Sequence, residues 1–127
     1  MTRPDNFKSI IRKAGIVFIS VILWVQCSGP REAPLILPAA SEPSAKIHND
    51  RGIQFYRQHQ YMDALLQFIQ ASVADQTAGE IHFNIALALL HRGEEGKAIE
   101  HFKLARKYAQ GNEMILKSPT LNHYLKP

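Results

Sequence analysis

The segment ALLQFIQA at residues 64–71 returns as AIEHFKLA at residues 98–105. Alanine occupies the first and last places of both copies, an aliphatic residue follows the first alanine, and phenylalanine occupies the fifth place. The two copies lie 34 residues apart. A repeat of this length, with small and aromatic residues at helical spacing, is typical of stacked helical hairpins. The sequence therefore predicts an all-α fold built from two helix-turn-helix units.

The helical spacing predicts four helices, at residues 45–59, 61–75, 78–92 and 95–109. The third is apolar on nearly every side, as expected of a helix flanked by other elements. Gly93 follows it as a helix-ending residue. Gly52 and Ala86, again 34 residues apart, are small where two helices should approach closely. Enlarging either should cost about 1–3 kcal/mol through overpacking.

We assign one repeat to residues 45–77 and the next to residues 78–112. Residues 113–127 are too few for a third repeat, but their apolar side chains predict a capping helix, broken or restarted at Pro119. Such stacks usually need at least three units to be stable alone. Two repeats and a cap therefore predict marginal stability or a homo-oligomer.

At these positions the chain resembles the tetratricopeptide repeat family. The matching residues of the two copies are Gly52, Tyr61, Ala64, Phe68 and Ala71, then Asn84, Ala86, Gly93, Ala98, Ile99, Glu100, Phe102 and Ala105. In that family, the first helix of each repeat lines a concave groove that binds protein segments. The resemblance implies that the groove is lined by Asn49, Ile53, Tyr56, Arg57, Phe83, Asn84, Leu87, Leu90 and His91.

Two interpretations of this groove stay open. In the first, Phe83 and Leu87 anchor a segment of a partner protein, because exposed apolar patches usually mark binding sites. In the second, the cap, the linker or a second copy of the chain covers the groove.

The N-terminal residues have the pattern of an export signal or a membrane anchor. Residues 1–13 are polar and basic, and the twelve residues 14–25 are free of charge. A membrane-spanning helix needs about 20 apolar residues, whereas an export signal needs about 7–15. Cys27 follows directly, and this arrangement resembles a bacterial lipoprotein, in which the cysteine sulfur receives a diacylglyceryl group. The alternative is that residues 1–26 stay as an uncleaved membrane anchor.

Residues 27–44 form a linker with four prolines, a density that prevents a continuous helix. The run Leu35-Ile36-Leu37 is its one apolar part. Three roles are open to this run: contact with the membrane surface, docking in the groove, or no contact at all. We favour a plain tether.

Composition and motifs exclude several classes of function. The formal charge of +4 lies mostly before Cys27, so no basic surface for nucleic acid is expected. The histidines are His48, His59, His82, His91, His101 and His123. His48 and His82 should lie near each other on stacked helices, but no pair has the spacing of a zinc helix, and neither a nucleophile nor a phosphate loop is present. We therefore expect no enzyme activity, no metal and no cofactor.

The leading hypothesis is a protein-protein interaction adaptor of the bacterial cell envelope, exported and held on the membrane by Cys27 or by the anchor. Its site would face the periplasm or the cell surface. The alternative is a structural subunit that self-associates or stacks within a larger membrane complex without a separate ligand. The absence of a third repeat favours this alternative.

Overall fold

The computed structural model describes residues 32–127, and in this range all regular structure is helical. The helices are α2 (Pro43–Arg57), α3 (Tyr61–Ala74), α4 (Gly79–His91), α5 (Glu95–Lys107), α6 (Glu113–Leu116) and α7 (Pro119–Tyr124). The prediction of an all-α fold is confirmed for these residues. The predicted signal or anchor segment and Cys27 lie outside them. Among the helices described here, none combines the length and the hydropathy needed to cross a bilayer.

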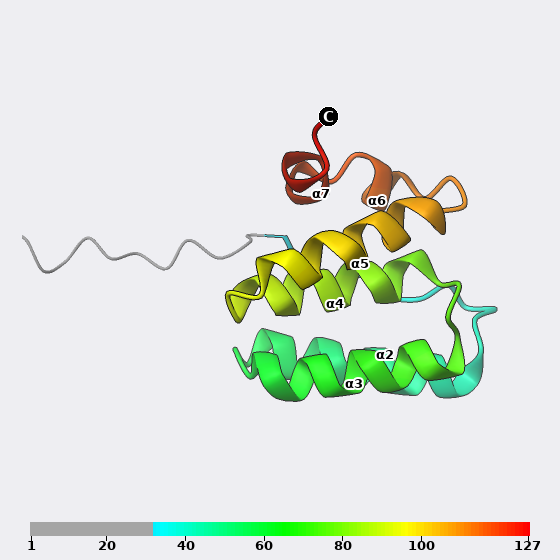
Figure 1. The fold of residues 1–127 in the computed structure, drawn as a ribbon. Coiled ribbons are helices and arrows are strands. Elements are labelled where there is room, and N and C mark those ends of the chain that lie inside the picture. Colours follow the sequence, from blue (N-terminus) through cyan, green and yellow to red (C-terminus); the bar gives the residue numbers. More distant parts are fainter. Residues whose placement is uncertain (1–31) are drawn as a thin grey trace, which may run out of the picture.

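The helices form a stack of antiparallel pairs. Helices α2 and α3 make one hairpin, α4 and α5 make the next, and α3 packs against α4 between them. Figure 1 shows the two short helices α6 and α7 on the side of α5 away from the first hairpin. The second hairpin therefore lies between the first hairpin and the C-terminal helices.

The repeated small and aromatic residues form the centre of each hairpin. Their side chains are completely buried: Ala64, Phe68 and Ala71 in α3, and Ala98, Phe102 and Ala105 in α5. Gly52 in α2 gives room for the Phe68 ring, since a Cβ atom at Gly52 would lie 2.5 Å from the nearest ring carbon. The close approach expected at Gly52 thus occurs within its own hairpin, between α2 and a side chain of α3.

Helix α4 is the centre of the fold, as its composition predicted. Every residue from Gly79 to Leu89 is buried, because α4 contacts α3 on one side and α5 on another. Gly93 follows α4 with a φ of +75°, a left-handed conformation that glycine adopts without strain.

The structure refines two of the predicted elements at the C-terminal end. The fourth helix stops at Lys107 instead of Ala109, because Gln110 and Gly111 adopt φ values of 48° and 82° and turn the chain. The capping helix, predicted to be broken or restarted at Pro119, consists of two short helices, α6 and α7. Pro119 begins α7, and the side chain of Ser118 accepts a hydrogen bond from the Leu121 amide at the start of that helix.

Candidate functional site

The face formed by α2 and α4 is occupied by residues 32–37 of the linker, which we call the strap. Figure 1 shows the cyan segment entering at one end of the stack and turning into α2 at the other. Leu37 is 2 % exposed and belongs to the hydrophobic core, whereas Ile36 is 71 % exposed. This alternation is that of an extended chain with one side buried. The prediction of a plain tether is wrong for these residues, and docking in the groove is the alternative that holds.

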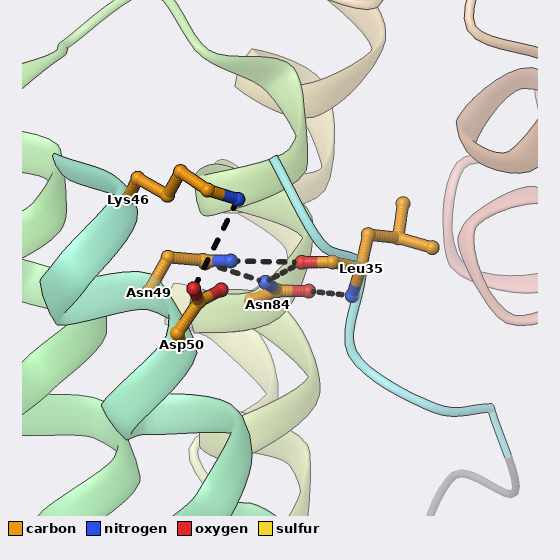
Figure 2. Close-up of polar contacts among 5 residues, drawn as sticks. All are labelled: Leu35, Lys46, Asn49, Asp50 and Asn84. Carbon is orange, nitrogen blue, oxygen red and sulfur yellow. Dashed lines mark hydrogen bonds and ion pairs between the residues drawn. The ribbon is translucent and has the colours of Figure 1, made fainter. Parts of the chain in front are cut away.

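Two asparagines hold the main chain of the strap at Leu35 (Figure 2). The Leu35 amide donates to Asn84 Oδ1 at 2.6 Å, and its carbonyl accepts from Asn84 Nδ2 at 2.8 Å and from Asn49 Nδ2 at 3.0 Å. Asn84 Nδ2 also donates to Asn49 Oδ1 at 2.8 Å. Both asparagines are completely buried. Because these bonds reach only main-chain groups, this asparagine clamp accepts any residue that has an N–H.

The first residue of the strap is fixed by its carboxylate. Glu32 Oε2 accepts from the Ser118 hydroxyl at 2.7 Å and from the Thr120 amide at 2.9 Å. The Glu32 carbonyl accepts from the Tyr56 hydroxyl at 3.4 Å. Ser118 is 1 % exposed. The strap therefore connects the first hairpin to the C-terminal helices, past the second hairpin.

These contacts define the direction of the strap. Glu32 lies beside Tyr56 near the end of α2, while Leu35 lies beside Asn49 two turns earlier in that helix. The strap thus runs antiparallel to α2. Asn84 and His91 in α4 have the same two-turn spacing, so both helices present one row of polar groups to the strap.

An aromatic cluster closes the end of the groove beside Glu32. His91 Nε2 lies 2.9 Å from the Tyr56 hydroxyl, and the Tyr61 ring stacks on the His91 ring with centroids 4.0 Å apart. Burial raises the pKa of the Tyr56 hydroxyl, and the neighbouring Tyr61 and Glu32 raise it further. Tyr56 is therefore a neutral phenol that can donate to a main-chain carbonyl.

Most of the predicted groove residues lie on the α2 and α4 face. Asn49, Asn84 and Tyr56 bond to the strap, and His91 and Arg57 line a pocket with Glu32. The other aliphatic positions are core: Ile53 and Leu87 are 4 % and 0 % exposed, and Leu90 is half-buried.

Neither of the two predicted anchors of a partner segment is exposed, since Leu87 is core, and Phe83 does not face the strap at all. Phe83 is 1 % exposed, and its ring packs edge-on against Phe102 at 5.8 Å between centroids, inside the second hairpin. Phe83 cannot anchor a partner without leaving the core, because it lies on the side of α4 that faces α5.

Sequence reasoning missed the groups on the other side of the interface: Glu32, Leu35, Leu37, Ser118 and Thr120. The available signal was the apolar run Leu35-Ile36-Leu37 within a proline-rich segment. That run indicates an apolar contact, but it identifies neither the side chains that are buried nor the surface that covers them.

His48 and His82 each form a hydrogen bond within their own hairpin. His48 Nδ1 lies 3.0 Å from Gln67 Oε1, and at the equivalent positions of the second hairpin His82 Nδ1 lies 3.2 Å from His101 Nδ1. Burial lowers the pKa of His101 to about 4, and the charge of His82 acts in the same direction. Within residues 32–127, no group of three His, Cys, Asp or Glu side chains could hold a metal ion.

A second surface lies on the outer side of α3. Met62, Leu66, Ile69 and Val73 recur at helical spacing and are 44–74 % exposed. We call this row the α3 stripe. A contiguous exposed apolar row of this kind usually marks a contact with another molecule.

Comparisons with protein-family models, with curated proteins and with solved structures found no match to this chain. Its function is therefore inferred from the geometry of the groove and the strap. The groups that meet there are amide, hydroxyl and main-chain hydrogen-bonding partners beside an apolar core. Such an arrangement holds an extended polypeptide.

Proposed function

We propose that this protein is a membrane-tethered interaction adaptor whose tetratricopeptide-like groove binds an extended segment of a partner protein in place of its own strap. The observation that carries the proposal is the asparagine clamp. Asn49 and Asn84 satisfy both the N–H and the C=O of one residue of the strap, Leu35. Main-chain recognition of this kind does not depend on the side chain that is held, so another chain can replace the strap.

The bond between the two asparagines supports exchange. Asn84 Nδ2 donates to Asn49 Oδ1 in addition to its bond with the strap. When the strap leaves, this pair persists and water can satisfy the remaining amide groups. The empty groove therefore carries no unpaired buried polar group, which would otherwise cost about 1–3 kcal/mol.

Replacement of the strap by a partner would change how far the domain can move from the membrane. Cys27 stands five positions before Glu32, so a lipid on Cys27 would hold Glu32, the first residue of the docked strap, within about 17 Å of the anchored residue. Release of the strap would add the length of residues 32–42, about 35 Å when extended. Intact mass spectrometry of the native protein tests the tether: a diacylglyceryl group that disappears in Cys27→Ser supports it, and an unmodified Met1 terminus supports an uncleaved anchor instead.

Photo-crosslinking in cells that make the protein tests the adaptor. A photoreactive amino acid at Arg57, on the groove rim, should form an adduct with a different protein, and Leu37→Ser, which weakens the strap, should increase it. The same probe at Val73, on the α3 stripe, is the comparison. Adducts at Val73 alone would exclude the groove as the binding site.

The α3 stripe favours a second candidate, the structural subunit that stacks on a copy of itself or within a larger complex. Leu66 and Ile69 are 50 % and 44 % exposed in the middle of α3, where a further helical pair could pack. Sedimentation at increasing concentration tests this candidate. A self-association that Leu66→Glu abolishes and Gln70→Glu preserves supports it, since Gln70 is also exposed on α3.

A further inference from the structure

The contacts of the strap show which of its residues the groove recognises. Leu35 is held through its main chain, Leu37 is buried, and Glu32 is held through its carboxylate. Ile36 points away from the groove at 71 % exposure, and Ala33 is exposed as well. Recognition is therefore concentrated at three of the strap's positions.

From this pattern we infer that the partner segment, given the proposed function, is an extended peptide of another protein with an acidic residue three positions before the clamped residue and an aliphatic residue two positions after it. It runs antiparallel to α2, as the strap does. The acidic side chain takes the bonds from Ser118 and Thr120. The aliphatic side chain takes the place of Leu37, and the clamped residue is any residue except proline, which lacks the N–H that Asn84 requires.

The strap competes with such a partner from within the same molecule. A short flexible connection gives a tethered segment an effective concentration on the order of 1 mM. A free peptide that makes the same contacts must exceed that concentration to displace the strap from half of the molecules, whatever affinity the peptide and the strap share. The wild-type groove is therefore closed to weak ligands, and a partner must either bind more tightly than the strap or meet a chain whose strap has been released.

A labelled peptide with the sequence of residues 32–38 is the probe, titrated by fluorescence anisotropy against the full chain in detergent micelles. The wild-type chain should bind it with an apparent Kd on the order of 1 mM. Two variants weaken the strap by different routes: Leu37→Asp removes the buried side chain, and Leu35→Pro removes the N–H that bonds to Asn84. Each should bind the probe at least about tenfold more tightly than wild type.

Variant peptides then test the three positions against a strap-weakened chain. Glu32→Gln and Leu37→Asp in the peptide should each weaken binding by about tenfold or more, because one loses a charge-assisted acceptor and the other a buried apolar group. Ile36→Asp is the matched control and should bind within about twofold of the probe, because the groove does not cover this side chain.

Three outcomes would overturn the inference, and each has a different meaning. If all peptide variants bind a strap-weakened chain equally, the groove takes extended segments without reading these positions, and only the proposed function stands. If neither strap-weakened chain binds any peptide while circular dichroism shows intact helices, the groove serves the strap alone and the proposed function fails as well. If the strap-weakened chains form dimers with wild type that the free peptide dissolves, the ligand is the strap of a second copy.

Discussion

The two helical hairpins are alike inside and different outside. Phe68 and Phe102, 34 residues apart, are both completely buried. The α3 stripe consists of Met62, Leu66, Ile69 and Val73, whereas the same positions of α5 are Gly96, Glu100, Lys103 and Lys107, all of them exposed. Hairpin packing fixes the inner positions, but it places no demand on the outer ones. The apolar side chains outside α3 are therefore not explained by the fold, which makes them a candidate contact surface.

The largest effects should come from the shared inner positions. Phe68→Ala and Phe102→Ala should each lower the free energy of unfolding by about 3–5 kcal/mol, because each removes a completely buried ring. Urea unfolding followed by circular dichroism measures both. Phe102 also stacks on Tyr124 of α7 with centroids 6.0 Å apart, so its removal should loosen the C-terminal helices in addition. If either substitution lowered the free energy of unfolding by less than about 1 kcal/mol, the two phenylalanines would not have equivalent roles in their hairpins.

Effects of intermediate size are expected at two glycines, one in each hairpin. Gly52→Ala should destabilise the fold by about 1–3 kcal/mol, because the new methyl group would overlap the Phe68 ring. Gly96→Ala is the matched control in α5, where no atom lies within 4 Å of the new methyl group. It should stabilise the protein by about 0.5 kcal/mol through helix propensity. Thermal unfolding of the two variants should therefore shift in opposite directions.

The histidine pair distinguishes the hairpins by pH. The unfolded chain protonates His101 near pH 6.5, whereas in the folded chain this pKa is about 4. The free energy of unfolding should therefore fall as the pH drops from 6.5 to 4, and His101 should cause no further loss below that range. The expected loss is about 1–2 kcal/mol after allowance for solvent screening of a partly exposed ring.

His101→Gln gives the second hairpin the His–Gln pair of the first, where His48 bonds to Gln67. It should flatten the fall in stability between pH 6.5 and 4, measured by urea unfolding at several pH values. Gln67→His is the reciprocal change and should steepen the fall. An unchanged pH profile in His101→Gln would assign the dependence to other groups.

The smallest effect on stability is expected at the α3 stripe. Leu66→Lys should change the free energy of unfolding by no more than about 0.5 kcal/mol, because Leu66 is half exposed in the monomer. It should nevertheless reduce any self-association seen by sedimentation. A loss of stability that grows with protein concentration would show that the stripe is buried in an assembly.

The helices and the groove face could be predicted because the responsible contacts are local. Contacting side chains of one hairpin, such as His48 and Gln67, are only 19 residues apart, and helical spacing identifies the side of each helix that packs inside its hairpin. Asn49, Tyr56, Asn84 and His91 were predicted through the resemblance to the tetratricopeptide repeat family, and their two-turn spacing within α2 and α4 places each pair on one side of its helix. Phe83 was misplaced because α4 is apolar all round, so its sequence does not tell the groove side from the hairpin side.

The sequence by itself determined the period, and through the period it determined the pairing of helices and the buried alanine and phenylalanine positions. Only the tertiary structure decided what fills the groove. The bonds of Leu35 with Asn84 span 49 residues, and those of Glu32 with Ser118 and Thr120 span 86 and 88. No helical or strand periodicity reaches that far. These partners meet only because two stacked hairpins and a C-terminal turn bring their surfaces together around an extended segment.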